Sequence, residues 1–370
     1  MLKKIALIIF AATLALSLAA CDIQENAFSS DDVQVSSGLY MYYMFNAYME
    51  AASKQTDTTV DLLKTDIEGT AAKEWIKNKA KEYATEYITI EKKFAELELA
   101  FTEEELSSIA QNSSMQYQQY QQYYAVNGVS ERSYYAYAKN ISKKQKVFES
   151  IYAENGTKPI AEDELKKFFA EKYALTTEIS FAKTDAEGNL LDEAGNAKVK
   201  EKAEGYAKRI RDGEDIEKLI VEQKNEKAKA EAEAAVAGTE DEPVIPEPEE
   251  VAEDANSSTV ISNIEVSEDE PVSQKITNIF DKVAVGTIGV VEDDDAYYVV
   301  KRDDILKAES TYGEYESKYD EYKAQIRYDI KGDEFEETIK SWVAEVKVKA
   351  DNRIIKKYSA DKIKTDDPQA

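Results

Sequence analysis

The sequence predicts an α+β protein, mainly helical, with a small antiparallel sheet inserted among the helices. Apolar residues recur at helical spacing over most of residues 38–173 and again after residue 311. Residues 286–305, "GTIGVVEDDDAYYVVKRDDI", have β-branched and aromatic residues on both sides of an acidic turn, which predicts a β-hairpin. The stretch "TTEISFAKTDAEGN", from about residue 175, predicts a strand that runs into a turn.

The helical pattern is clearest between residues 76 and 97. Apolar and aromatic residues recur there at spacings of four and three, with Lys and Glu on the other faces: Ile76, Ala80, Tyr83, Tyr87, Ile90, Phe94 and Leu97. Thr102 and Glu105 have the spacing of a capping box, so the next helix is expected to begin there. The Gln/Tyr-rich stretch 113–128 fits either a helix with an adaptable aromatic surface or a low-complexity segment without a particular role.

Composition shifts divide the chain into regions. Residues 22–37 are polar and unpatterned, which predicts a flexible tether, and residues 38–173 form the helical region. Residues 174–310 hold the strand and hairpin signals. Within them, residues 224–258 are first Lys/Glu/Ala-rich and then acidic and Pro-rich, which predicts a disordered insertion. Residues 311–370 predict two amphipathic helices, expected to pack on the N-terminal region.

Charge and composition exclude several classes of function. The net charge of −27 would repel nucleic acid, and the chain contains no histidine, which removes His-based triads, metal sites and acid–base catalysis. No phosphate-cradling Gly-rich loop is present. The acidic run Glu292–Asp295 is expected to be a charged hairpin tip rather than a Ca²⁺ loop, since glycine-punctuated ligand spacing is missing. We therefore expect neither a cofactor nor a metal.

The N-terminus has the pattern of an exported lipoprotein. Lys3 and Lys4 precede an apolar run that ends in Leu18-Ala19-Ala20-Cys21, and Cys21 is the single cysteine. This resembles the bacterial lipobox, in which the cysteine is diacylated after cleavage; the alternative is an ordinary signal peptide that ends in Cys. Two acyl chains would anchor the protein to the outer face of the bacterial cytoplasmic membrane.

Three stretches carry a resemblance to a known family. "AKRIRDGEDIEKLIVEQ" matches a helix–glycine–"E-D-F-x-x-L-A" pattern, and "IFDKVAVGTIGVVEDDDAYYVVKRDD" matches "Phe-x-Leu-x-x-Gly-Glu-[Ile/Val]" followed by "Gly-Tyr-His-Ile-Ile-Lys", with one extra residue before Gly286. "EVKVKADNRIIKKY" is similar to a "V-x-V-N…Y" ending. Together with the order of elements and the lipobox, they resemble the PrsA/SurA-type extracytoplasmic foldases, whose parvulin-type prolyl isomerase domain lies between helical segments.

The resemblance implies a parvulin-like domain at residues 174–310 in which the active-site pattern is degenerate. The two family histidines fall near Glu178 and at Tyr298, and the family's "Gly-Gly-Asp-Leu-Gly" loop is absent. Prolyl isomerisation needs an apolar cleft and hydrogen-bond donors, for which Phe280 and Tyr297 would supply binding surface. A tyrosine can donate a hydrogen bond, so weak catalysis stays open, but loss of activity is favoured.

The favoured function is a foldase that holds unfolded or nascent secreted polypeptides. Tyr and Met side chains of the helical region are the candidate client contacts, although ordinary core packing is the favoured interpretation of each: Met41, Met44, Tyr117, Tyr120, Tyr123 and Tyr124. The alternatives are an active prolyl isomerase and a structural or adhesive surface lipoprotein. A homodimer is left open.

Overall fold

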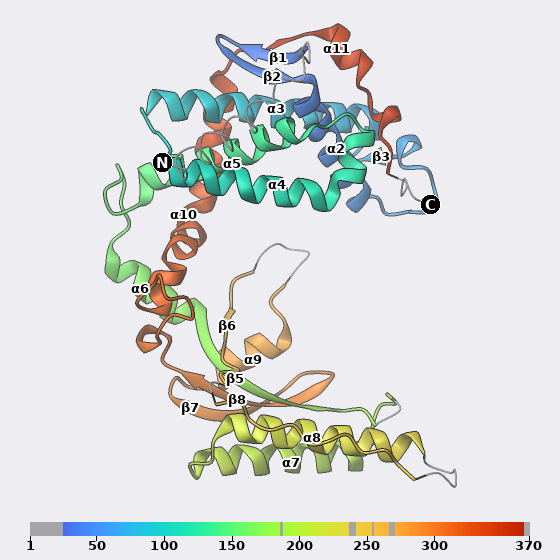
Figure 1. Ribbon diagram of the computed structural model, residues 1–370, viewed down its shortest axis with the longest axis vertical. Coiled ribbons are helices and arrows are strands. Elements are labelled where there is room, and N and C mark those ends of the chain that lie inside the picture. Colours follow the sequence, from blue (N-terminus) through green and yellow to red (C-terminus); the bar gives the residue numbers. More distant parts are fainter. Residues whose placement is uncertain (1–24, 186–187, 237–241, 254, 266–270, 366–370) are drawn as a thin grey trace, which may run out of the picture. The chain divides into compact units, whose positions relative to one another are not determined.

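The computed structural model describes residues 25–185, 188–236, 242–253, 255–265 and 271–365. They form two compact units (Figure 1): a helical unit made of Met1–Pro159 and Lys331–Ala370, and a sheet unit made of Ile160–Ile330. Helices predominate and every strand pairing is antiparallel, so the predicted α+β class is confirmed.

The helical unit contains these elements of the chain in order: β1 (Asn26–Ser30), β2 (Val33–Ser36), α2 (Ser37–Ser53), η1 (Leu62–Lys64), β3 (Asp66–Ile67), β4 (Thr70–Ala71), α3 (Ala72–Glu96), α4 (Glu103–Val126), α5 (Glu131–Tyr152), the second half of α10 (Lys318–Glu345), β9 (Lys349–Ala350), α11 (Asn352–Lys357) and η3 (Ala360–Lys362).

Helix α2 is the centre of this unit. Its sequence, SGLYMYYMFNAYMEAAS, is apolar on nearly every face, which is the pattern of a helix surrounded by other elements, and it packs against α3 and α5. Ser36 caps it: its Oγ accepts a hydrogen bond from the N–H of Leu39 at 3.2 Å. The Tyr42 ring lies 4.5–5.6 Å from the rings of Tyr124, Tyr134 and Tyr137, so aromatic edges and faces fill the space between the helices.

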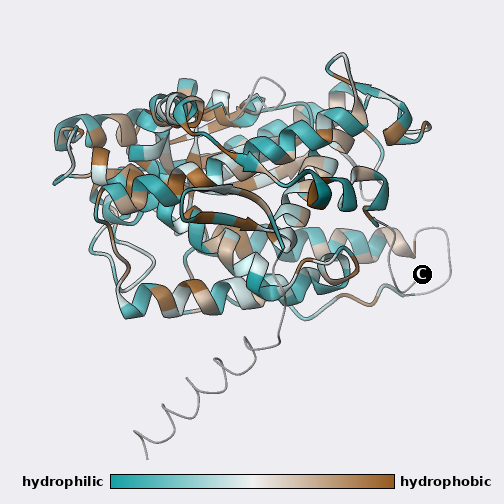
Figure 2. Ribbon diagram, turned by 90° about the horizontal axis from the view of Figure 1, so that it is seen from above, coloured by the Kyte–Doolittle hydropathy of each residue, from teal (hydrophilic) through white to brown (hydrophobic). Residues whose placement is uncertain are grey.

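The helices beside α2 follow the predicted pattern. Ile76, Ala80, Ile90 and Phe94 are buried on one stripe of α3, whereas Leu97 is 41% exposed, because the helix ends at Glu96. The capping box at the start of α4 is confirmed: Thr102 Oγ1 accepts from the N–H of Glu105, and the Glu105 carboxylate accepts from the N–H of Thr102. The Gln/Tyr-rich stretch is helical, since it forms the second half of α4 and ends with the glycine turn after it. Figure 2 shows hydrophobic and hydrophilic residues interspersed along the helices.

The predicted flexible tether is wrong for most of its length. Residues 26–36 form the β1–β2 hairpin, and β1 also pairs with β9 near the other end of the chain. The Phe28 ring packs edge-on against Tyr40 at 5.3 Å between centroids. Alternating buried residues are few in so short a stretch, and the strand β9 that completes the sheet lies more than 300 residues away, so local pattern alone does not indicate it.

The sheet unit contains α6 (Glu162–Lys172), β5 (Tyr173–Ala182), α7 (Glu193–Arg211), α8 (Ile216–Ala235), β6 (Thr259–Ser262), α9 (Gln274–Lys282), β7 (Thr287–Glu292), β8 (Ala296–Asp303), η2 (Ile305–Lys307) and the first half of α10. Its strand order is β6-β5-β8-β7, and the predicted hairpin is β7–β8. The unit extends beyond the 174–310 region proposed from the sequence at both ends. Phe169 of α6 stacks on Tyr322 of α10 and contacts Tyr173 of β5, so both helices belong to it.

The two faces of this sheet are covered differently. Helices α7 and α8 lie on one face and α9 on the other (Figure 1). Ile179, Phe181, Tyr297 and Val299 point to the α7–α8 face and form one core with Tyr206. On the opposite face Val291 and Val300 pack under Ile279 and Val283 of the α9 region. This division follows from strand geometry, because successive side chains point to opposite faces.

Two other expectations are corrected. The disordered insertion predicted for residues 224–258 is helical up to Ala235, because its Lys/Glu/Ala composition continues α8 and places Lys and Glu four residues apart. The two predicted C-terminal helices are one continuous helix, α10, which carries buried Tyr319, Ile326 and Phe335 and is followed by the short α11. Tyr315 precedes α10 and is exposed. No helix in the described part of the chain is long and apolar enough to cross a membrane.

The buried tyrosines predict loss of stability in alkali. Burial raises the pKa of Tyr40 to about 12, whereas an unfolded tyrosine ionises near 10. The stabilising contribution is complete below pH 10 and is lost as the pH rises toward 12, because only the unfolded chain releases the proton. Urea unfolding followed by circular dichroism is expected to show a steeper fall above pH 10 for the wild type than for Tyr40→Phe. Parallel curves for the two proteins would contradict this assignment.

Candidate functional site

The pairing of β5 with β8 places the two predicted catalytic positions on one face of the sheet. Glu178 is opposite Val300, and Ser180 is opposite Tyr298. Glu178 and Tyr298 therefore lie diagonally on neighbouring strands, on the face that α9 covers.

Glu178 is held in an ion pair. Lys275 Nζ of α9 lies 3.0 Å from Glu178 Oε2, and Thr176 Oγ1 donates to the other carboxylate oxygen at 3.1 Å. The side chains of Glu178 and Lys275 are 18% and 29% exposed, so solvent screens this pair only partly. The Lys275 ammonium is also 5.0 Å from the ring centre of Tyr298, so the lysine contacts both predicted positions.

Tyr298 is a neutral hydrogen-bond donor whose proton is already engaged. Its hydroxyl donates to Asp293 Oδ2 at 3.1 Å. Burial, together with the Asp293 carboxylate, raises the pKa of Tyr298 to about 12. Asp293 is itself held in the hairpin turn, where Oδ1 accepts from the N–H groups of Asp295 and Ala296. The turn thereby positions the acceptor for the tyrosine.

The aromatic residues predicted to bind substrate lie in different surroundings. Phe280, at the end of α9, packs under the guanidinium of Arg302, whose central carbon is 4.6 Å from the ring centre. Arg302 is buried and donates to the carbonyl of Val283 at 3.0 Å, and burial lowers its pKa. Tyr297 points to the opposite face, into the α7–α8 core, with Lys183 over its ring. Tyr297 and Tyr298 therefore do not share a surface.

This face holds two hydrogen-bond donors beside buried apolar side chains. Tyr298 and Lys275 are the donors, and Ile279, Val291 and Val300 are the apolar neighbours. Among the described residues, no three Asp, Glu, Cys or His side chains gather in a way that could hold a metal ion.

The six candidate client contacts divide by burial. Met41 and Met44 are 2% and 1% exposed, so they fill the core of the helical unit. Tyr117 and Tyr124 are also buried, and the Tyr117 hydroxyl donates to the carbonyl of Val129 at 3.0 Å. Tyr123 is half-buried, and Tyr120 is 46% exposed. Tyr120 is thus the candidate that offers most surface.

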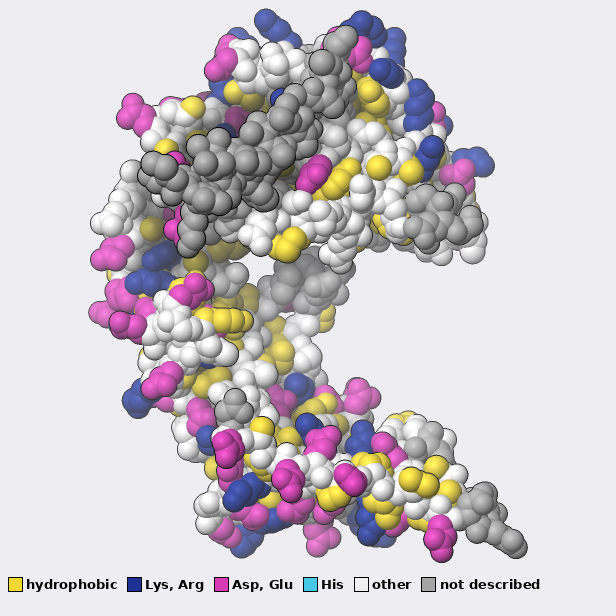
Figure 3. All heavy atoms as spheres, viewed as in Figure 1, with side chains coloured by type: hydrophobic (Ala, Val, Ile, Leu, Met, Phe, Trp, Pro, Cys, Tyr) yellow, Lys and Arg dark blue, Asp and Glu magenta, His cyan; other side chains and the backbone are white. Residues whose placement is uncertain are grey.

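Helix α4 exposes an uncharged face. From Leu106 to Ser130 no residue is charged, although 33% of the whole chain is charged. Met115 and Tyr120 are exposed on this face together with several glutamines. The surface over α4 that grey atoms leave visible in Figure 3 is mainly white and yellow. We call the exposed side chains of residues 106–130 the neutral face.

A shallow groove of about 340 Å³ continues the neutral face between α4 and α5. It is lined by Phe101, Glu105, Ser108, Ile109, Asn112, Ser113, Gln116, Ala138, Ser142, Gln145, Lys146 and Glu149. Its charged lining residues lie toward one end, where Lys146 pairs with Glu105 at 2.9 Å. The remaining lining is amide, hydroxyl and apolar. Sequence reasoning missed this groove, and also the roles of Lys275 and Asp293. The groove depends on how α4 and α5 pack, the Lys275 contact joins elements 97 residues apart, and the Asp293 contact depends on the conformation of the hairpin turn.

Cys21, the predicted lipidation site, lies outside the described residues. Its modification therefore stays a prediction from the lipobox pattern.

Comparison with known proteins yields structural neighbours only. No protein-family model and no curated protein matches the chain. The chain is similar to the crystal structure of foldase protein PrsA from Streptococcus pneumoniae str. Canada MDR_19A, with 15% identity over 83% of this chain and 99% of that one, and a TM-score of 0.34. It is also similar to foldase protein PrsA from Lactococcus lactis, with 13% identity over 90% and 99% of the two chains, and a TM-score of 0.35.

The ion pair at the sheet face gives a stability prediction. Lys275→Met leaves the half-buried Glu178 carboxylate with Thr176 as its side-chain partner, so we expect a loss of about 1 kcal/mol in the free energy of unfolding. Adding Glu178→Gln is expected to recover part of this loss, which a double-mutant cycle in urea measures. Lys282→Met, at the exposed end of the same helix, is the control and should change stability little. Additive effects of the two substitutions would show that the pair is not coupled.

Proposed function

We propose that this protein is an extracytoplasmic foldase that holds unfolded secreted polypeptides at the neutral face of its helical unit. In this proposal a diacylated Cys21 tethers it to the outer face of the cytoplasmic membrane. The sheet unit is a parvulin-like domain with weak or no isomerase activity. The neutral face is the observation that carries the proposal, because it is the property that distinguishes this surface from the rest of a strongly acidic chain.

Side-chain chemistry supports a broad binding role for this face. Tyr120 and Met115 supply apolar area that adapts to different partners. Glutamine amides both donate and accept, so they can pair with an unfolded main chain in many registers. Since the face carries no net charge, it repels neither acidic nor basic segments, while the acidic remainder of the protein keeps a bound complex soluble.

The contacts of the sheet face support the proposal that isomerase activity is weak or absent. The Tyr298 proton is engaged by Asp293, and the Glu178 carboxylate is paired with Lys275, so neither group is poised to polarise a prolyl amide. Helix α9 packs directly on the apolar part of this face. Binding of a proline there would have to displace existing contacts.

The first test measures suppression of aggregation. A denatured client protein is diluted into buffer with the wild type or with the double variant Met115→Glu/Tyr120→Glu, and light scattering is followed. We expect the variant to lose roughly half or more of the protection, because two charges interrupt the exposed apolar area.

A matched control places the same charges elsewhere. Leu190→Glu/Tyr312→Glu changes two exposed apolar side chains of the sheet unit and should protect as well as the wild type. Equal loss in both double variants would trace the effect to net charge rather than to the neutral face. Absence of any protection by the wild type would favour an adhesive lipoprotein with one specific partner.

Prolyl isomerase activity is the second candidate, and it is favoured by the position of Glu178 and Tyr298 on one face of adjacent strands. The test is the refolding rate of a client limited by prolyl isomerisation, which is slow without a catalyst. We expect little acceleration by the wild type and no further loss in Tyr298→Phe. A clear acceleration that Tyr298→Phe abolishes would establish the enzyme and assign the tyrosine as its donor.

A further inference from the structure

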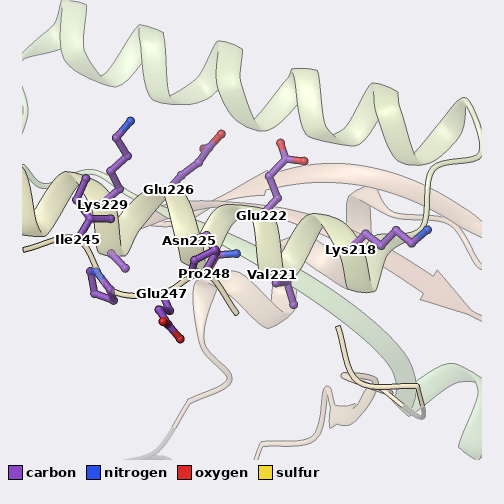
Figure 4. A pocket seen from close by; sticks show the side chains of 11 residues that line it. Lys218, Val221, Glu222, Asn225, Glu226, Lys229, Ile245, Glu247 and Pro248 are labelled. Carbon is purple, nitrogen blue, oxygen red and sulfur yellow. The ribbon is translucent and has the colours of Figure 1, made fainter. Parts of the chain in front are cut away.

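A proline-rich segment lies along helix α8 of the sheet unit. Residues 242–253, EPVIPEPEEVAE, have no helical or strand pairing and pass beside the helix (Figure 4). We call them the strap. Five of the twelve residues are glutamate, and Val244 and Ile245 are exposed, so burial of apolar side chains does not account for its position.

The strap is held through its main chain by one asparagine. Asn225 Nδ2 donates to the carbonyl of Glu249 at 3.0 Å, and the N–H of Glu249 donates back to Asn225 Oδ1 at 2.8 Å. The amide thus satisfies both backbone groups of a single residue. Such a contact recognises an extended backbone, since within a helix the same two groups would be paired with other turns.

The two prolines before Glu249 explain why Asn225 contacts the main chain at Glu249. Pro246 and Pro248 have no N–H, and each restricts its own φ and the conformation of the residue before it. A chain of this kind favours the extended polyproline II conformation, in which backbone groups have no internal partners. Glu249, directly after Pro248, offers both an N–H and a carbonyl, and these are the groups that Asn225 contacts.

The strap does not fill the space beside the helix. A pocket of about 520 Å³ remains between the two, lined by Val221, Asn225 and Ala228 of α8 and by Ile245, Pro246 and Pro248 of the strap, among others. The close-up in Figure 4 shows the Asn225 side chain directed toward Pro248 and the strap backbone. A loosely packed contact with a good backbone clamp is what an exchangeable ligand would make.

A second contact fastens the chain beyond the strap. The Glu217 carboxylate accepts hydrogen bonds from the N–H and the hydroxyl of Ser257, at 2.8 and 2.7 Å. Because α8 precedes the strap and Ser257 follows it, the strap is tied at both ends to the element it covers. This raises its effective concentration at Asn225 above that of any free peptide.

We propose that α8 carries a binding site for extended, proline-rich peptide segments. Asn225 binds such a segment through hydrogen bonds to its main chain, and in the intact protein the strap occupies this site. The strap is an internal competitor, so another polypeptide binds only when it displaces these residues. This site is separate from the neutral face, and the inference does not depend on the proposed foldase role.

The binding test uses the strap sequence as the probe. A fluorescein-labelled EPVIPEPEEVAE peptide is titrated, with anisotropy as the readout, into the chain from Asp22 onward in two forms: intact, and with residues 242–253 replaced by Gly and Ser in equal number. We expect saturable binding to the replaced form and at least tenfold weaker binding to the intact form.

Substitutions in the replaced form test the role of the asparagine. Asn225→Ala should weaken peptide binding about tenfold, and Lys227→Ala, at an exposed position of the same helix, should leave it unchanged. A peptide with alanine at its three prolines should also bind more weakly.

Limited proteolysis tests the same contact in the intact chain. A glutamate-specific protease should cleave the strap several-fold faster in Asn225→Ala than in the wild type or in Lys227→Ala, because cleavage requires the strap to leave the helix.

The inference is overturned if the replaced form keeps its wild-type circular dichroism but does not bind the peptide. It is also overturned if Asn225→Ala changes neither peptide affinity nor cleavage rate.

Discussion

The antiparallel pairing of β5 with β8 is the constraint on which the sheet unit depends. Because side chains alternate along each strand, one register sends Ile179, Tyr297 and Val299 to the α7–α8 core and leaves Glu178 and Tyr298 facing α9. A slip by one residue would exchange the two sets and bury the carboxylate in an apolar core. The same pairing therefore stabilises the fold and assembles the candidate site.

The neutral face and the strap differ in charge, and the contacts proposed for them differ accordingly. The neutral face of α4 omits charge over a long stretch, so exposed tyrosine, methionine and glutamine can contact polypeptides of either charge. The strap is instead strongly acidic and is held by backbone hydrogen bonds, which are indifferent to side-chain charge. In both proposals, polypeptide is recognised without a dedicated pocket for one side chain.

Sequence reasoning succeeded where the signal was periodic or local and failed where it needed a distant partner. The α3 stripe, the Thr102–Glu105 capping box and the β7–β8 hairpin each have their signal within a few turns or residues. The β1–β2 hairpin was missed because the strand that completes its sheet is near the other end of the chain. Lys275 gave no signal, because a lysine on an amphipathic helix is ordinary until a strand places Glu178 beneath it.

The sequence by itself determined the α3 stripe, the start of α4, the β7–β8 hairpin, the acidity and the uncharged stretch 106–130, because each is a property of neighbouring residues. Only the tertiary structure decided which aromatic and methionine side chains are surface. Tyr117 and Tyr120 both lie among glutamines of α4, yet the first is 7% exposed and contacts Tyr134 of α5, and the second is 46% exposed. The burial of a side chain and its hydrogen-bond partners depend on which other element packs against it. The spacing of residues along one element does not identify that second element.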